Sequence, residues 1–383
     1  MKRKLIVLAA SCGLLLTACG DVTGNNQTTT TDTSTSEKAK ATTSQLSKDY
    51  YRNVINDGQY KVSQSRGVSL SLNSGYNIKA FETGLMNLSH SEFPTDTYYF
   101  QEGQQLDAET ISKWIKRSSG DNSEPDLTVS DPEGLNPVDN GELEPDKRAP
   151  KYLSQILEQN YMVKDGDNFK LAGISIGLAL NSVDYYQKVQ YGAEFKTDIQ
   201  RANLEAEGKK MANEIVARLR KMEGLGNIPI TVGLFEQTPK DSLAGGVFFS
   251  EGVSKDGAAT VANWKDINEK KVIFPRTDGE TSNETTSFEN FKSQVQSFFP
   301  NLNGVTAEAT YSGDQLIKMK ATVTTQFYGQ SEIIALTQHV SDNASKYLPP
   351  NIPIEISINS IDGMEAFLNR DSGEKEFQSH VFD

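Results

Sequence analysis

Two long amphipathic helices, each followed by an alternating strand, dominate the hydrophobic pattern of the chain. Their apolar residues are spaced three or four positions apart, as on one face of an α-helix: Met211, Ile215, Leu219 and Met222 in the first, and Ile333, Leu336, Val340, Ala344 and Tyr347 in the second. Both strands begin with Asn-Ile-Pro-Ile, at 227–230 and 351–354. Proline favours the start of a strand or an edge position. The shared motif favours an internal duplication over coincidence.

The pattern before each long helix is also similar in the two halves. Both halves contain a predicted short amphipathic helix and then an alternating strand: 151–159 and 172–180 in the first, 287–299 and 319–323 in the second. The first half adds three strand-like segments and a helix: 60–72, 76–81, 98–100 and 108–117. We therefore predict an α+β fold with two domains, each an antiparallel or mixed sheet packed on amphipathic helices.

The predicted domains are residues 48–280 and 281–383, joined within the polar segment 276–286. The first domain includes an irregular loop, 118–150, with nine acidic residues, two basic residues and five prolines. Loops of this length are either functional or disordered. Four of its carboxylates are candidate oxygen ligands for a weak calcium site: Asp131, Glu133, Asp139 and Glu142. Their spacing matches no EF-hand loop, and a solvated acidic loop is the alternative.

The N-terminus has the pattern of an export signal. Three basic residues, at positions 2–4, precede an apolar run from Leu5 to about Leu16, as in a removable signal peptide of residues 1–18. The run is shorter than the roughly 20 apolar residues that span a bilayer. Its end, Leu16-Thr17-Ala18-Cys19, is similar to a lipobox: a branched residue, small residues and then the cysteine that receives the lipid.

Cysteine usage agrees with lipidation at Cys19. Cys12, the only other cysteine, lies inside the apolar run and would leave with the signal peptide. Cleavage between Ala18 and Cys19 therefore leaves one cysteine, which excludes an intramolecular disulfide. We expect a lipid anchor on the extracellular face of the cell membrane and processing by lipoprotein-processing enzymes. Residues 19–47, rich in Thr and Ser, are predicted to be a flexible tether.

The charge of the chain argues against nucleic acid as a partner. The formal net charge is −13, and removal of the three basic residues of the signal makes it −16 (−13 − 3). Nucleic-acid backbones are bound by Lys and Arg. The acidic balance indicates solubility and does not identify a ligand.

Candidate catalytic groups are few, and we predict a body that is not an enzyme. Gly173-Ile-Ser175-Ile-Gly177 matches the G-x-S-x-G sequence of hydrolases, but that chemistry needs a strand-to-helix turn and a histidine partner. Here Ser175 lies within an alternating strand. Three scattered histidines, His90, His339 and His380, form no zinc pattern, and His339 is expected to face solvent. No cofactor is expected, and Trp114 and Trp264 are interpreted as packing residues.

The whole chain resembles the CamS family of Gram-positive lipoproteins, known as sex pheromone precursors. The resemblance covers the signal and lipobox, the Thr/Ser-rich tether, the Gly134-Leu-Asn-Pro137 segment of the acidic loop and the two Asn-Ile-Pro-Ile strands. It implies that a heptapeptide or octapeptide cut from the signal peptide induces conjugative plasmid transfer. The candidates lie within Leu5–Ala18. Residues 5–11 are closer to the family's pheromones than residues 12–18, which directly precede Cys19.

Three roles for the mature body remain open. The first is a binding or adhesion module without enzymatic activity, carried by a palmitate-type lipid anchor on the cell surface. The second is a solute-binding lipoprotein of a transporter, which predicts two doubly wound lobes with parallel sheets. The third is a wall-associated hydrolase. Apolar–polar alternation in most strands predicts sheets with one buried face, which counts against the second role.

Overall fold

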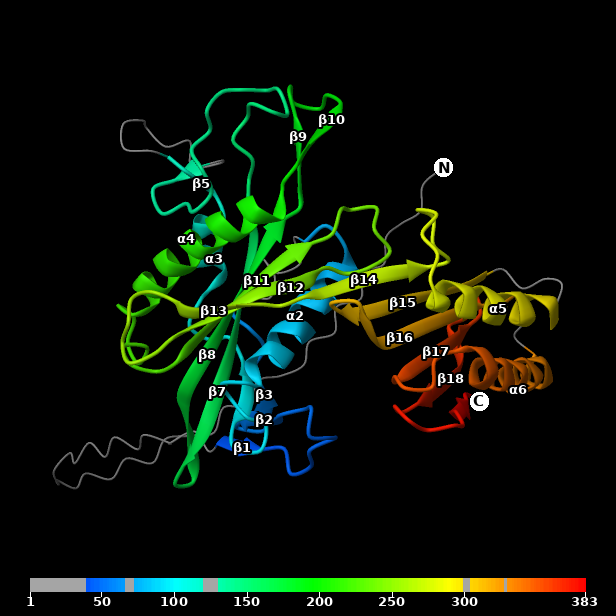
Figure 1. The fold of residues 1–383 in the computed structure, drawn as a ribbon. Coiled ribbons are helices and arrows are strands. Elements are labelled where there is room, and N and C mark those ends of the chain that lie inside the picture. The colour runs from blue at the N-terminus through cyan, green and yellow to red at the C-terminus, as the bar shows by residue number, and fades with distance from the viewer. Residues whose placement is uncertain (1–38, 66–71, 120–129, 299–303, 327–328) are drawn as a thin grey trace, which may run out of the picture. The chain divides into compact units, whose positions relative to one another are not determined.

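The computed structural model describes residues 39–65, 72–119, 130–298, 304–326 and 329–383 (Figure 1). The predicted signal peptide, the lipobox with Cys19 and the tether up to residue 38 lie outside these residues. Lys38–Asp383 forms one compact unit, and it contains all the hydrophobic clusters of the described chain. Within the described residues, no helix has the length and apolar character needed to cross a bilayer.

The first sheet has nine strands in the order β1-β2-β4-β7-β8-β11-β12-β13, with β3 paired to β2. Their bounds are β1 Ala39–Ala41, β2 Arg52–Asn56, β3 Gln59–Tyr60, β4 Tyr99–Glu102, β7 Leu153–Asp165, β8 Asn168–Asn181, β11 Ile230–Gln237, β12 Val247–Ser254 and β13 Ala262–Asp266. Two small two-stranded sheets accompany it: β5 Arg117–Ser118 with β6 Ser130–Asp131, and β9 Val183–Gln187 with β10 Glu194–Asp198.

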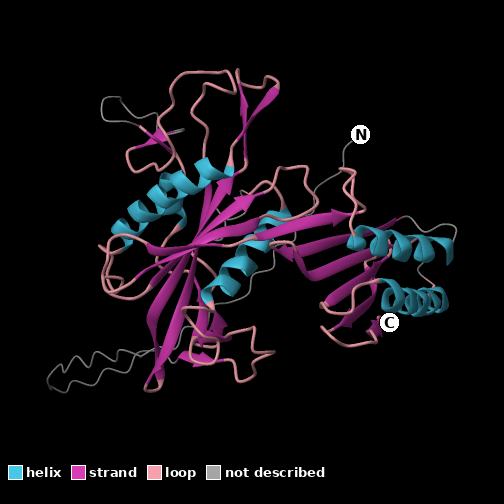
Figure 2. Cartoon of the chain, viewed as in Figure 1, coloured by secondary structure: helices cyan, strands magenta, loops and turns pink. Residues whose placement is uncertain are grey.

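Helices cover both faces of this sheet (Figure 2). One face packs against α3 (Ala108–Trp114) and α4 (Arg201–Leu219), whose apolar residues join those of β8 and β11 in one core. The other face packs against α2 (Gly75–Ser89). Phe81 and Leu85 of this helix belong to a second, smaller hydrophobic cluster. The prediction of one buried face per sheet is therefore wrong for the first sheet.

The second sheet has six strands in the order β14-β15-β16-β17-β18-β19. Their bounds are β14 Glu269–Phe274, β15 Gly304–Ser312, β16 Gln315–Thr324, β17 Ile354–Asn359, β18 Met364–Arg370 and β19 Gln378–Val381. The helices α5 (Asn283–Phe298) and α6 (Gln330–Tyr347) supply apolar residues to its single core. Both helices were predicted, and here the expected alternation of buried and exposed positions is observed.

The two sheets repeat one topology. In the first, β4-β7-β8-β11-β12-β13 pair antiparallel throughout except for the parallel pair β8·β11. In the second, β14 to β19 pair in the same way, with β16·β17 parallel. A helix connects the equivalent strands in both, α4 in one and α6 in the other. The α+β fold class is thus confirmed, and the repeated topology agrees with the predicted internal duplication. The strands of the described residues form no doubly wound parallel lobes.

The Asn-Ile-Pro-Ile motif starts the parallel strand in both copies. Proline has no N–H, but its carbonyl accepts from the neighbouring strand: Pro229 from Ile174 at 3.1 Å and Pro353 from Met319 at 3.2 Å. Because a proline directly before the first residue of a strand leaves no ladder bond unmade, it is tolerated there. The motif therefore occupies the equivalent structural position in the two copies.

Two predicted segments have the wrong secondary structure. Residues 151–159, predicted as a helix, form the start of β7, and residues 76–81, predicted as a strand, form the start of α2. In β7 both faces are covered, so Leu153, Ile156 and Leu157 are all buried and the alternation is lost. In α2 the Ser74 side chain caps the helix by accepting from the Asn77 N–H.

The remaining predicted segments agree in part. The helix near 108–117 corresponds to α3, and 98–100 falls on β4. The segment 60–72 is a strand only at Tyr60, in β3, and its residues 66–71 are outside the described part. The second sheet begins with Glu269, before the predicted domain boundary at 280/281, which remains a prediction.

Candidate functional site

Ser175 has a structural role in the core of the first sheet. It is fully buried in the middle of β8, and its Oγ lies 2.6 Å from the Oγ of Ser89 on α2. A Cβ at Gly177 would lie 2.7 Å from the ring of Phe81, and one at Gly173 would lie 2.1 Å from the ring of Phe93. The G-x-S-x-G sequence therefore provides space for α2 and the residues after it, and Ser175 is not on a strand-to-helix turn.

The histidines lie in separate places. His90 packs edge-on against Tyr51, with ring centroids 5.2 Å apart. His339 stacks on Phe298 at 4.0 Å, and its Nε2 lies 3.0 Å from the carbonyl oxygen of Gln294. His339 is half-buried, so the expectation that it faces solvent is met only in part, because its ring also joins α6 to α5. His380 packs against Phe382 on β19 and its end.

Both tryptophans pack against the larger core of the first sheet, in agreement with their interpretation as packing residues. Trp114 is 4% exposed, and its Nε1 donates to the Glu133 carboxylate at 3.1 Å. Trp264 packs on Gly252, where an added Cβ would lie 2.8 Å from the indole. The Lys209 ammonium lies 5.2 Å from the centre of the Trp264 ring.

The acidic loop is anchored by two buried polar residues. Arg117 donates to the carbonyl oxygens of Pro137 (3.0 Å) and Ala149 (2.7 Å). Asn136 donates to the carbonyl oxygen of Leu153 and accepts from its N–H, both at 2.8 Å. The Gly134–Pro137 segment is therefore fixed to the core. Among the described residues, no three His, Cys, Asp or Glu side chains gather to hold a metal ion, so nothing in this part of the loop supports the calcium site.

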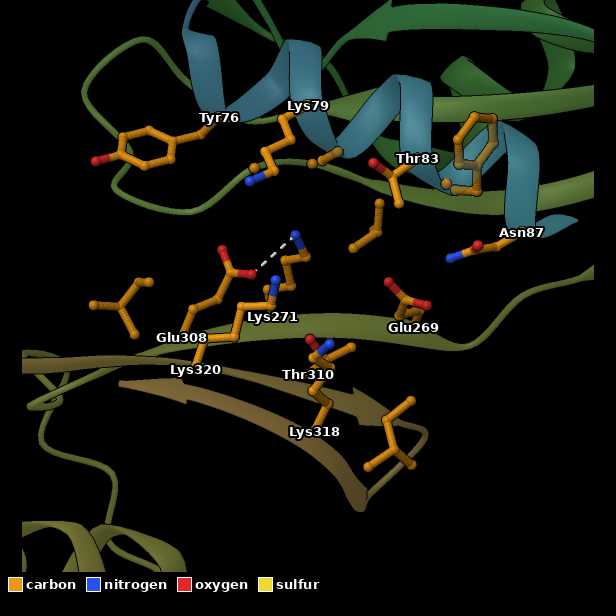
Figure 3. A pocket seen from close by; sticks show the side chains of 18 of the residues that line it. Tyr76, Lys79, Thr83, Asn87, Glu269, Lys271, Glu308, Thr310, Lys318 and Lys320 are labelled. Atoms are coloured by element: carbon orange, nitrogen blue, oxygen red, sulfur yellow. Dashed lines mark ion pairs between the residues drawn. The ribbon is translucent and has the colours of Figure 1, made fainter. Parts of the chain in front are cut away.

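A cleft of about 880 Å³ lies between α2 and the outer face of the second sheet (Figure 3). Its lining combines side chains of α2, the segment 243–248 that leads into β12, and the strands β14, β15 and β16. The strand side chains come from the face opposite α5 and α6, because the apolar residues of the alternate positions belong to the core. This volume falls within the roughly 300–1,000 Å³ of small-ligand sites.

Ammonium groups gather at one end of the cleft. Figure 3 shows Lys79, Lys271 and Lys320 directed toward the space beside the Glu308 carboxylate. Lys271 pairs with Glu308 at 3.1 Å, and their side chains are only 16% and 24% exposed. Lys320 also reaches Glu355, at 3.2 Å. Partial burial of these charges weakens solvent screening, so they act more strongly on a ligand than surface charges do.

A carboxylate and an amide occupy the other end. Glu269 lies there below Asn87 of α2, with Thr83 and Thr310 between the two ends (Figure 3). Burial raises the pKa of the Glu269 carboxyl and Glu308 adds to this effect, whereas Lys271 acts to lower the pKa. The cleft thus has cationic and acidic ends and can orient a polar ligand.

The sequence did not indicate this site. Its residues come from segments separated by more than a hundred positions, and the α2 segment was predicted as a strand. Lysines and threonines at every second position of β16 (Lys318, Lys320, Thr322 and Thr324) are also typical of a solvated strand face. Conversely, the lipobox residues Leu16, Thr17, Ala18 and Cys19 lie outside the described residues, so the structure places none of them.

Comparisons with known proteins identify one family. The family model described as CamS sex pheromone cAM373 precursor matches residues 60–376. A solved sex pheromone precursor from Lactobacillus salivarius subsp. salivarius is 40% identical, with a TM-score of 0.83, covering 90% of this chain and 99% of the other. The C-terminal domain of the staph-cAM373 precursor from Staphylococcus aureus is 32% identical, with a TM-score of 0.68, covering 82% and 99%.

A search of the curated proteins finds no match. The family model nevertheless spans most of the chain, and both solved relatives share its fold. The chain therefore belongs to the CamS sex pheromone cAM373 precursor family.

Proposed function

We propose that this protein is a surface lipoprotein, anchored through Cys19, whose signal peptide is the source of a secreted peptide that induces conjugative plasmid transfer. The observation that carries the proposal is the basic–apolar–lipobox sequence of residues 1–19 on a chain of the pheromone-precursor family. Membership in this family indicates an extracellular or surface protein. The body would act by binding, without enzymatic activity, and the cleft is its candidate ligand site.

Anchoring is tested by replacing each cysteine separately. Cys19→Ala should abolish incorporation of labelled palmitate and release the chain from the membrane fraction, because only the thiol at this position can take the thioether-linked lipid. Cys12→Ala is the matched control and should still be labelled and membrane-bound. Labelling that survives Cys19→Ala would contradict the anchor site.

Peptide release is tested in recipient cells by exchanging the signal. A strain whose body is fused to an unrelated lipoprotein signal should lose the plasmid-transfer response of donor cells, although the anchored body is unchanged. Mass spectrometry of the wild-type culture should detect a peptide from Leu5–Ala18. If the exchanged strain behaves as wild type and no such peptide is found, the signal peptide is not the messenger.

A further inference from the structure

Exposed apolar side chains mark the cleft between α2 and the second sheet. Tyr76, Leu243 and Ile317 are 57%, 63% and 38% exposed, and all three line this cleft. Tyr76 lies at the end with Lys79 (Figure 3). Large apolar groups exposed along one concave surface are a feature of binding sites, whereas singly scattered ones are not.

Positive charge exceeds negative charge at the Lys79 end. Near this end Lys271 pairs with Glu308, and Lys318 and Lys320 share the Glu355 carboxylate, which does not line the cleft. Among the described residues, Lys79 has no ion-pair partner. Over the whole lining, four lysines face three carboxylates, those of Glu251, Glu269 and Glu308, so the cleft has a formal excess of one positive charge (4 − 3) in a chain of net charge −13. An anionic group is therefore attracted to this point of the surface, although the protein as a whole repels it.

The middle of the cleft offers neutral hydrogen-bonding groups. The hydroxyls of Thr83 and Thr310 and the amide of Asn87 face it (Figure 3). Hydroxyl and amide groups both donate and accept hydrogen bonds, which matches the alternating N–H and C=O groups of a peptide backbone. An amphiphile with a plain hydrocarbon tail would leave these groups without partners, and unpaired polar groups in a filled cleft are costly.

We propose that the cleft binds a short, mostly apolar peptide through its free C-terminal carboxylate. The carboxylate binds beside Lys79, Lys271 and Lys320, the backbone amides contact Thr83, Thr310 and Asn87, and apolar side chains pack on Leu243 and Ile317. The proposal depends neither on lipidation at Cys19 nor on release of a peptide from this chain.

The test uses residues 20–383, which contain the whole compact unit. Two pools of apolar hexapeptides are offered, one with free carboxylates and one with C-terminal amides, and retained peptides are identified by mass spectrometry. The acid pool should be enriched over the amide pool. The best acid peptide is then titrated by calorimetry, with octanoate and inorganic phosphate as separate probes for a lipid-like and a phosphate ligand.

Variants identify the end of the cleft that binds the carboxylate. Lys79→Ala should weaken binding of the acid peptide roughly tenfold, as expected for loss of a charge-assisted hydrogen bond, and leave thermal unfolding unchanged because Lys79 is exposed. Lys270→Ala is the matched control, since Lys270 pairs with Asp314 and does not line the cleft. Equal retention of both pools, tighter binding of octanoate or phosphate, or no effect of Lys79→Ala would overturn the proposal.

Discussion

Glu158 shows how one side chain can organise a loop. This residue of β7 is 1% exposed, and its carboxylate accepts from the backbone N–H groups of Gln104 (3.1 Å), Gln105 (3.0 Å) and Leu106 (2.7 Å). The loop it holds leads directly into α3, whose cap is Asp107. A buried carboxylate is tolerated here because the loop N–H groups, which have no helical partner, supply its hydrogen bonds.

Stability should depend on pH through Glu158. Burial raises its pKa above the ordinary value, although the three N–H groups act to lower it. The protonated Glu158 side chain then contributes fully to stability below the pKa of Glu in the unfolded chain, near 4.3. This contribution is lost as pH rises through the pKa of Glu158 in the folded protein. Relative to Glu158→Gln, which cannot titrate, the wild type should lose stability from about pH 4 upward, as measured by urea unfolding. The prediction is contradicted if the difference in free energy of unfolding between wild type and Glu158→Gln stays constant as pH rises, or changes in favour of the wild type.

The two copies secure the same helix-to-strand connection with arginines from different elements. Arg220, after α4, donates to the carbonyl oxygens of Leu225 and Ile228 (both 2.7 Å) and to the Ser254 Oγ (2.7 Å). Ser254 pairs with Ile230, and in the second copy the residue that pairs with Ile354 is Arg370. Arg370 is 2% exposed and donates to the carbonyl oxygen of Pro349. Both copies thus place a guanidinium at this connection, which comes from the end of the helix in the first copy and from the strand in the second.

Arg220→Ala should lower the free energy of unfolding by about 2–4 kcal/mol, because it leaves several carbonyl oxygens without donors. Urea denaturation measures this, with Lys221→Ala as the matched control: Lys221 is exposed, so its loss should change stability by less than about 0.5 kcal/mol. Equal effects of the two substitutions would show that the connection does not depend on Arg220.

Adding Ser254→Arg to Arg220→Ala transplants the arrangement of the second copy into the first. The double variant should recover part of the lost stability in the same urea experiment, because the new guanidinium starts from the strand position of Arg370. A double variant less stable than Arg220→Ala alone would mean that the two connections are not equivalent.

Elements whose apolar residues keep the helical or the alternating period could be predicted from the sequence, even β8 and β11, which are buried on both faces; β7 could not. The spacing of Phe288, Phe291 and Val295 in α5, like that in α6, matches the face that enters the core. In β7, by contrast, Gln155 and Glu158 are as buried as the apolar residues between them, so the strand loses its period of two. The cleft could not be predicted because it depends on how α2 meets strands that follow it by some two hundred positions.

At the scale of the whole molecule, the second copy of the fold begins with β14. It pairs with β15 along Glu269–Phe274, and Phe274 is 1% exposed in the core of the second sheet. Only Ile267 and Asn268 separate it from β13 of the first sheet. The sequence placed the boundary at the polar segment after β14, because that segment is the more loop-like of the two connections.

This assignment predicts how fragments behave. Residues 266–383 should unfold cooperatively in urea, whereas residues 281–383 should be less stable by several kcal/mol, because they lack Phe274 and expose the edge of β15. Circular dichroism during urea titration measures both. If the two fragments are equally stable, β14 is dispensable and the predicted boundary at 280/281 stands.

Mass spectrometry of the N-terminal peptide of the protein, extracted from membranes, tests the lipoprotein assignment most directly. We expect the mature chain to begin at Cys19 and to carry a diacylglyceryl group on the Cys19 sulfur, with residues 1–18 absent. A chain that begins elsewhere, or an unmodified Cys19, would contradict the lipoprotein assignment and leave the two-sheet body as the only place to look for function.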